Sequence, residues 1–282
     1  MKGKVSNILL VLIFVAGLSL LLYPTISNYY NAYLQSQIIA DYSQQVDEMD
    51  AEANALALSY AQRYNALLNQ REDPYHLTPE LEELYWNLLR TTDDEIMAYV
   101  HIPSIEVTLP IAHGTEDPTL KKNVGHMKWS SLPVGGESTH SVISAHRGLP
   151  SAELFTNIDH LERGDMFYIH VLGQTLEYMV DHIAVVEPYD YTLLTVTEGK
   201  DYVTLMTCTP YGINSHRLLV RGVRIGTAEQ ESQSLIVKNE VTQIDLRLIM
   251  TVSLGTLAAL SFLLQAMLTR TRKRKERKPD ET

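Results

Sequence analysis

The 282-residue sequence contains one cysteine, two tryptophans and four phenylalanines. A single cysteine excludes an internal disulfide, and no Cys/His or carboxylate cluster has the spacing of a structural zinc site. The sequence also lacks a glycine-rich phosphate loop, an internal repeat and a low-complexity tract. These absences predict no metal, and they make the chemistry of the one thiol the main question.

Positive charge is scarce in the middle of the chain. Residues 24–244 carry 13 Lys and Arg against 30 Asp and Glu, whereas residues 269–282 carry seven against three. An acidic surface repels phosphate backbones, so we expect no nucleic-acid partner. Attraction to lysine-bearing partners is one interpretation of the acidic region, and a merely solvated surface is the other.

Both ends of the chain are apolar. Residues 1–24 combine Lys2 and Lys4 with the uncharged run Ile8 to Tyr23, which is typical of an uncleaved signal anchor or of a cleaved signal peptide. Residues 248–268 form a second uncharged run, whose 21 residues at ~1.5 Å each match a ~30 Å hydrocarbon core. A buried core helix is the alternative.

The basic tail at residues 269–282 directly follows the second apolar run. Positively charged flanks remain in the cytoplasm, so we expect two membrane spans with both termini inside. Residues from about 25 to 245 would then face outward, at the extracellular surface of the cell membrane.

The region 25–95 has a helical pattern. Apolar residues recur at three- and four-residue steps across 30–71, which predicts one long helix. A second helix begins after Thr78, a natural N-cap that precedes a proline. Between them, residues 72–77 form a short break, because Pro74 disfavours helical geometry at Asp73.

The pattern changes to short β-type runs across residues 96–226, before a polar linker at 227–247. One short helix is expected at 151–157. The runs are rich in β-branched and aromatic residues and are separated by Pro, Gly, Asn and Asp. They are Met97–His101, Val107–Ile111, Ser141–Ala145, Met166–Leu172, Thr175–Val186, Tyr202–Thr207 and Leu218–Ile225. A mainly β fold, a closed or partly closed antiparallel barrel, is expected.

Cys208 ends one of these runs, and Arg217 opens the next. If the two strands form a symmetric hairpin, the two residues lie opposite each other with Cβ atoms ~5 Å apart. A guanidinium beside a thiol lowers the thiol pKa, and it also donates hydrogen bonds to a developing oxyanion. The sequence therefore predicts a nucleophilic thiol with an adjacent cation.

A thiol nucleophile needs an acid–base partner, and His146 is the candidate among ten histidines because it follows a strand at a loop. His216 is nearer to Cys208 in sequence, but its neighbour Arg217 points to the opposite face of the strand. The remaining candidates are expected to be solvated in loops or at edges. They are His113, His126 and His140.

Thr204, Leu205, Thr207 and Cys208 resemble the TLxTC signature of the sortases. The segments Ser144–Gly148 and Asn214–Val220 match the His and Arg segments of that family, and the likeness extends from about Ile96 to Ile225. The resemblance implies a closed, eight-stranded sortase-type β-barrel. It also implies a Cys208, His146 and Arg217 triad, with Thr204, Leu205 and Thr207 as support.

The flanks resemble the class C sortases, which have a second membrane span and an N-terminal lid with an Asp-Pro-aromatic motif. Asp73, Pro74 and Tyr75 match that motif, although the usual aromatic is Trp or Phe. By this resemblance Tyr75 would lie over Cys208, and Asp73 would pair with Arg217. An ordinary interhelical turn is the alternative.

The resemblance implies a cysteine transpeptidase that cleaves an LPXTG-like sorting signal between Thr and Gly. The thioester on Cys208 would pass to a lysine amine of another pilin subunit, and no cofactor is needed because a thioester conserves the energy of the amide. Three alternatives remain: a housekeeping sortase that uses a cell-wall precursor, a secreted cysteine protease, and a non-catalytic pilus assembly scaffold.

Overall fold

A computed structural model describes residues 2–91 and 95–227 of the chain. The predicted second membrane span and basic tail, and nearly all of the predicted linker, lie outside the described residues. The described elements begin with three helices and continue as eight strands with short helical turns between them. They are α1 (Lys2–Glu48), α2 (Ala51–Leu68), α3 (Pro79–Asn87), β1 (Ile96–Ile102), η1 (Pro103–Ile105), β2 (Val107–His113), α4 (Asp117–Leu120), β3 (Val124–His126), β4 (Thr139–Ser144), η2 (Ile158–His160), β5 (Met166–Val171), β6 (Gln174–Val186), η3 (Thr192–Leu194), β7 (Asp201–Thr209) and β8 (His216–Thr227).

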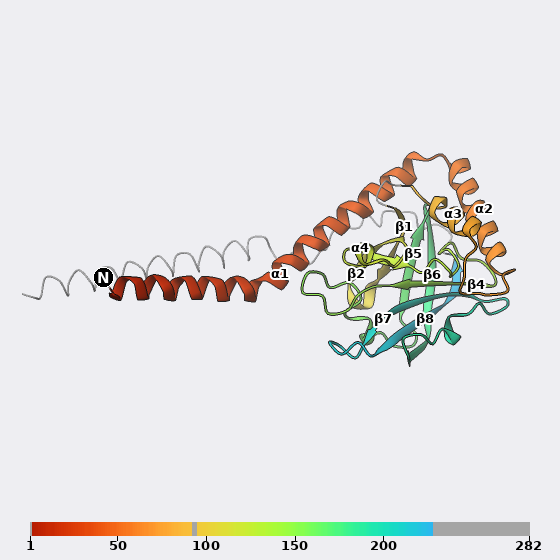
Figure 1. Cartoon of the computed structure of the whole chain (residues 1–282). Coiled ribbons are helices and arrows are strands. Elements are labelled where there is room, and N and C mark those ends of the chain that lie inside the picture. The colour runs from red at the N-terminus through yellow and green to blue at the C-terminus, as the bar shows by residue number, and fades with distance from the viewer. Residues whose placement is uncertain (1, 92–94, 228–282) are drawn as a thin grey trace, which may run out of the picture. The chain divides into compact units, whose positions relative to one another are not determined.

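The eight strands close into one barrel in the order β1-β2-β3-β4-β7-β8-β6-β5 (Figure 1). The expected eight-stranded closed barrel is therefore confirmed, but the expectation that it is wholly antiparallel is wrong. β2 pairs with β3, and β4 with β7, in parallel. Crossover connections allow these pairings, since α4 lies between β2 and β3 while β5 and β6 intervene between β4 and β7.

The barrel interior explains why the β-type runs form strands. Alternate residues of neighbouring strands, such as Ile143, Leu205 and Val220, are fully or almost fully buried in the main core. Strand β3 is absent from the sequence prediction because Val124–His126 is only three residues long. Such a run is too short to show a period-two pattern.

The N-terminal helical region differs from the expected single helix over 30–71. Helix α1 ends at Glu48, and Asp50 caps α2 by accepting a 2.7 Å hydrogen bond from the backbone N–H of Ala53. Asp is a favoured N-cap residue, so it starts a new helix rather than continuing the old one. The expected N-cap at Thr78 is confirmed, since its hydroxyl accepts from the N–H of Leu81.

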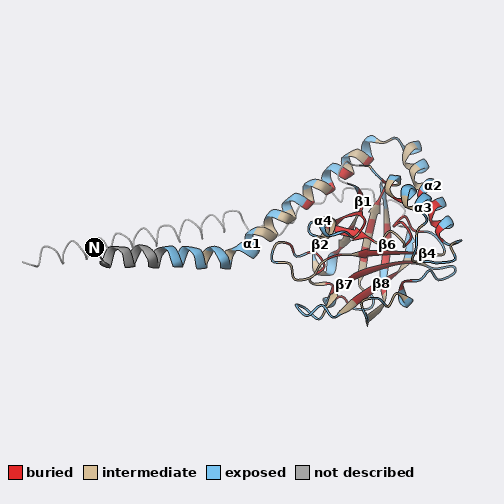
Figure 2. Ribbon diagram, in the orientation of Figure 1, coloured by how far each residue is buried: buried red, intermediate tan, exposed pale blue. Residues whose placement is uncertain are grey.

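One segment, Leu12–Glu48, is long and apolar enough to cross a membrane. Its first part exposes large apolar side chains, among them Leu20 and Leu21 (Figure 2). The second part of α1 packs on the barrel, where Tyr42 donates to the carbonyl of Met97 and accepts from the N–H of Leu172. The helix therefore combines an apolar N-terminal portion with a C-terminal portion that belongs to the folded domain.

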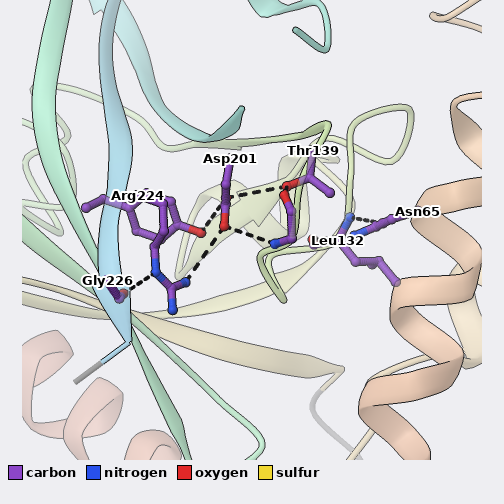
Figure 3. A network of polar contacts seen from close by, with 8 residues as sticks. Asn65, Leu132, Thr139, Asp201, Arg224 and Gly226 are labelled. Carbon is purple, nitrogen blue, oxygen red and sulfur yellow. Dashed lines mark hydrogen bonds and ion pairs between the residues drawn. The ribbon is translucent and has the colours of Figure 1, made fainter. Parts of the chain in front are cut away.

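Helices α2 and α3 contribute Ala61, Tyr64, Leu68 and Tyr85 to the main core. Buried Asn65 of α2 exchanges two hydrogen bonds with the backbone of Leu132, at 2.8 and 3.1 Å (Figure 3). An amide side chain can satisfy one N–H and one C=O in this way. The pair fastens α2 to the segment between β3 and β4.

The short helix expected at 151–157 is wrong. Leu154 has a left-handed φ of 43° that a continuous α-helix does not accept, and the following helical turn is η2. Leu154 and Phe155 are buried in the main core instead. Burial of these two apolar residues decides the conformation over local helix propensity.

Candidate active site

The candidate site is centred on β7, which lies between β4 and β8 in the barrel wall. Cys208 is the register partner of Arg217 on β8, as expected from the hairpin. On the other side, β4 runs parallel to β7 and its last pair is Ser144 with Met206. If the same register continues for two more residues, His146 comes alongside Cys208, so we expect the three residues to occupy one transverse row.

Two hydrogen bonds continue the alignment of the chain beyond the end of β4. The N–H of Ala145 donates to the carbonyl of Met206 at 3.2 Å, and the hydroxyl of Thr207 donates to the carbonyl of Ala145 at 2.8 Å. Thr207 is buried and immediately precedes Cys208. Its hydroxyl therefore holds the backbone directly before His146 and links the two strands of the site.

The row lies on the outer face of the barrel wall. Met206 and Leu219, two residues from Cys208 and Arg217, belong to a small apolar cluster with Val142 and Leu194, outside the main core. Since side chains on a strand alternate, Cys208 and Arg217 share the face of Met206 and Leu219. Cys208 is a free thiol of intermediate exposure on that face.

The other signature residues have structural environments on both faces of β7. Leu205 is fully buried in the main core. Thr204 is buried on the outer face, where its hydroxyl contacts Nε2 of His140 at 2.7 Å. These contacts fix β7, so the signature residues position the strand that ends on the thiol.

Two loops meet at the rim of the site. The guanidinium of Arg147 lies 5.6 Å from the ring centre of Tyr211, in the loop after Cys208. Gly148 has a φ of 72°, and a Cβ at this position would lie 2.8 Å from the Tyr211 ring. Arg147 also forms an ion pair with Asp159. The loop after β4 is thereby packed against the loop between β7 and β8.

The segment of residues 72–77, called the lid segment below, lies between α2 and α3 as the sequence predicts. Tyr75 packs edge-on against Trp129, with ring centres 5.3 Å apart, and against Tyr191 at 5.5 Å. Its hydroxyl donates to the carbonyl of Tyr191 at 3.3 Å. Burial, with the negative charges of Asp190 and Asp73, raises the pKa of the Tyr75 phenol.

Trp129 and Tyr191 connect the lid segment to the outer face that carries Cys208. Both rings pack on the cluster that contains Met206 and Leu219. Arg71 donates to the carbonyls of Trp129, at 2.8 Å, and His76, at 3.1 Å. The lid segment is thus fastened over the same face as the thiol, and direct cover of Cys208 by Tyr75 stays a prediction.

The expected ion pair between Asp73 and Arg217 is not formed. Asp73 pairs with His76 at 3.3 Å and accepts from the N–H of Tyr75, while Arg217 donates to the carbonyl of His216. Among residues 2–91 and 95–227, no ion pair joins the two. A partner three residues away costs little chain entropy to reach, so the local pair forms instead.

The expectation that His113, His126 and His140 are solvated is also wrong. All three are at most 1% exposed, and each hydrogen-bonds at least one backbone carbonyl. Burial lowers the pKa of His126 to about 3 and of His140 to about 4. These are neutral structural rings, which leaves His146 as the half-buried histidine of the row.

The sequence prediction missed Trp129 and Tyr191 as parts of the site. Trp129 is one of only two tryptophans and follows a short strand, and Tyr191 lies in the segment after the long strand β6. Bulky aromatic residues in loops are a recognisable signal for contact surfaces. Neither lies near Cys208 in the sequence, so no local pattern connects either ring to the thiol. The order of the strands in the barrel brings these segments to the same face.

The arrangement is suited to acyl transfer by a thiol. A partly exposed sulfur, a cation on β8 and an imidazole just after β4 are the kinds of group that such a reaction needs as nucleophile, oxyanion partner and proton donor. Within the described residues, no group of three or more His, Cys, Asp or Glu could hold a metal ion. The chemistry of the described site is that of a cysteine transferase or hydrolase.

Comparison with known proteins identifies one family. A family model described as a sortase domain matches residues 100–225. The chain is similar to the crystal structure of sortase C1 from Streptococcus agalactiae, with 42% identity and a TM-score of 0.66 over 67% of this chain and 98% of that one. It is similar to sortase C of Streptococcus pneumoniae, a structure described in terms of catalysis and pilin substrate specificity, with 46% identity and a TM-score of 0.61 over 69% and 100%. Sortase A of Bacillus anthracis is 25% identical over 226 residues, 80% of this chain and 97% of that protein.

Proposed function

This chain belongs to the sortase family of cysteine transpeptidases, and we propose that it polymerises pilin subunits at the outer face of the cell membrane. Its substrate would be a secreted protein with an LPXTG-like sorting signal. Its second substrate would be the side-chain amine of a lysine in another pilin subunit. The product is an isopeptide bond between the two subunits.

The first half of the reaction breaks the Thr–Gly amide. The sulfur of Cys208 attacks the threonine carbonyl carbon, and the guanidinium of Arg217 stabilises the negative charge that develops on the carbonyl oxygen. The C–N bond then breaks, and His146 gives a proton to the departing glycine amine. The threonine remains attached to Cys208 as a thioester.

The second half of the reaction uses the same groups in reverse. A neutral lysine amine attacks the thioester carbonyl, and the C–S bond breaks to return the electron pair to sulfur. His146 takes the proton that the new amide nitrogen loses, so the site is restored. Limited access of water to the thioester would favour the amine over hydrolysis.

One observation carries the catalytic assignment: Cys208 and Arg217 are register partners, and the register of β4 leads to His146 on the other side of the thiol. It supports a three-residue site because functional groups in one row of adjacent strands lie about 5 Å apart. Met206 and Leu219 belong to a cluster outside the main core, which supports an outer-face position for the row.

The pilin-polymerising assignment is supported by the 42–46% identity to sortase C structures. The aromatic contacts of Tyr75 with Trp129 and Tyr191 favour a lid over an ordinary turn. The apolar part of α1 would anchor the protein, with residues 96–226 as the extracellular catalytic domain and 25–95 as the region that carries the lid.

Mass spectrometry of the joined product tests this proposal. The purified protein is incubated with a sorting-signal protein and with two competing acceptors, a lysine-bearing pilin domain and a cell-wall precursor peptide. We expect a thioester-dependent isopeptide bond to lysine. Joining only to the precursor would show a housekeeping sortase, and release of free threonine carboxylate alone would show a protease. Polymer that forms normally with Cys208→Ala would show a scaffold.

A further inference from the structure

His140 joins strand β7 to the segment that follows β6. The ring is buried on the outer face of β4, 1% exposed, and Nε2 lies 2.7 Å from the hydroxyl of Thr204 on β7. Nδ1 lies 3.0 Å from the backbone carbonyl of Thr195. Thr195 belongs to the segment of residues 187–200 between β6 and β7, called the β6–β7 loop below.

The two contacts fix the protonation state of this ring. A carbonyl oxygen only accepts hydrogen bonds, so Nδ1 carries the hydrogen that is donated to Thr195. Nε2 then keeps a lone pair, which accepts the hydroxyl hydrogen of Thr204. Burial lowers the pKa of His140 to about 4, which agrees with a neutral ring. Both ring nitrogens are therefore hydrogen-bonded. Thr204 donates to the His140 ring, and the ring donates to the carbonyl of Thr195.

The bridged loop packs on the outer face of β7 and also contacts the lid segment. Leu194, next to Thr195, is buried in the cluster with Met206 and Leu219, which are two residues from Cys208 and Arg217. Tyr191, four residues before Thr195, packs against Trp129 and accepts a hydrogen bond from Tyr75. The hydroxyl and the N–H of Thr192 both donate to the carboxylate of Asp190, two residues earlier, which makes the start of η3 a compact turn.

We propose that His140 is a positioning residue that holds the β6–β7 loop in place on the outer face that carries Cys208, where the peptide would bind. It acts through Thr204 and the Thr195 carbonyl, and it does not touch the reacting atoms. This role rests on the proposed function for the identity of the peptide, but the loop contact itself does not. In this proposal the hydroxyl of Thr204 orients the His140 ring, and the ring restrains the β6–β7 loop.

The chain offers a matched control for this bridge. Thr175 and His170 form a similar Thr–His contact at 3.0 Å between β6 and β5. Those strands lie beside each other in the barrel but are separated from β7 by β8. Removing the Thr175 hydroxyl therefore deletes a contact of the same kind without reaching the β6–β7 loop.

Hydrogen exchange on the folded protein, without substrate, tests the bridge directly. We compare Thr204→Val, Thr204→Ser, His140→Phe and the control Thr175→Val. Amide exchange at residues 191–196 should be about 5- to 20-fold faster in Thr204→Val and His140→Phe, and close to the parent rate in Thr204→Ser and Thr175→Val. A loop that exchanges at the parent rate in both bridge variants would overturn the proposal. So would exchange that rises equally across the whole barrel.

Peptide cleavage separates positioning from a general structural effect. Release of the amine fragment from a sorting-signal peptide should show a KM raised about 5-fold or more in Thr204→Val, with kcat changed less than 2-fold, and recovery in Thr204→Ser. An equal loss in kcat at unchanged KM would contradict a role of the loop in peptide binding. If the parent protein does not cleave the peptide, the proposed function fails, while the exchange result still decides the role of His140.

Discussion

The two ends of strand β7 differ in how fully their polar groups are hydrogen-bonded. At its start, the Asp201 carboxylate accepts hydrogen bonds from the N–H of Gly136 at 2.9 Å and from the hydroxyl of Tyr178 at 2.9 Å. It also lies 3.9 Å from the guanidinium of Arg224 (Figure 3). At the other end, Cys208 is a free thiol of intermediate exposure beside Arg217, whose guanidinium bonds only to the neighbouring carbonyl of His216 among the residues that the structure describes.

The difference separates groups that stabilise from groups that react. A buried carboxylate is costly unless donors surround it, and burial raises the pKa of Asp201 despite those donors. At the Cys208 end, the only hydrogen bond of the Arg217 guanidinium within the described residues goes to the carbonyl of His216, so most of its donors remain unused. The hydrogen-bonded Asp201 end of β7 thus helps to fix the position of the strand. The proposed reaction at the Cys208 end depends on that position. Variants at each end should therefore have separable effects.

The largest effect is expected for Cys208→Ala. Removal of the sulfur eliminates the thioester, so joining of a sorting peptide to an amine should fall by at least about 10³-fold. The folded state should keep its stability, because the thiol is partly exposed and makes no structural bond. Product formation is measured by mass spectrometry, and unfolding is followed by circular dichroism on the same samples.

A control variant sharpens this test of the reactive end. Arg217→Lys keeps a positive charge but loses the planar guanidinium, so it should retain folding and lose much of the rate. Substantial product with Cys208→Ala would remove the thiol from the mechanism. A large loss of stability in that variant would instead break the contrast between the two ends of β7.

A smaller effect, on stability rather than rate, is expected for Asp201→Ala. The change leaves the N–H of Gly136, the Tyr178 hydroxyl and the Arg224 guanidinium without their acceptor, at a cost of about 2–3 kcal/mol. Thermal unfolding should shift down by roughly 4–10 °C. Below the transition, kcat/KM for peptide cleavage should match that of the parent.

Asp117→Ala provides the surface comparison. Asp117 pairs with Lys121 at 3.6 Å, but its side chain is 81% exposed, so its removal should cost under about 0.5 kcal/mol. Equal melting temperatures for the Asp201 and Asp117 variants would show that the buried network contributes nothing special. Loss of catalysis in Asp201→Ala at full folding would show that the two ends are coupled.

The sequence predicted more of the reactive end than of the stabilising end. Cys208 and Arg217 were identified because a hairpin is a local structure, and the loop length fixes which residues face each other. Asp201 also opens a β-type run, yet its partners Gly136, Tyr178 and Arg224 come from three other parts of the chain. No spacing rule connects them, so this network becomes visible only in three dimensions.

Three of the errors have the same origin. The parallel pairing of β4 with β7 depends on crossover connections, and the buried state of His140 depends on a carbonyl 55 residues away. Asp73 was assigned to a distant arginine by resemblance, and a histidine three residues away competes better. Local patterns therefore predicted all strands but the short β3, while long-range packing decided how polar groups are paired.

The smallest effect is expected at the lid segment, which adjoins the reactive end. Tyr75→Ala removes ring contacts with Trp129 and Tyr191, so the closed arrangement should lose about 1 kcal/mol and Cys208 should react about 3- to 10-fold faster with a small thiol reagent. The reaction rate is measured by mass spectrometry in the absence of substrate.

Two variants serve as controls. Tyr75→Phe keeps the ring contacts with Trp129 and Tyr191 and loses only the 3.3 Å hydrogen bond to Tyr191, so its labelling rate should stay near that of the parent. Tyr60→Ala, a change at an exposed tyrosine of α2, controls for loss of an aromatic ring elsewhere. Identical labelling in Tyr75→Ala and Tyr60→Ala would mean that the lid segment does not restrict the thiol, and the openness of the Cys208 end would then belong to the barrel wall alone.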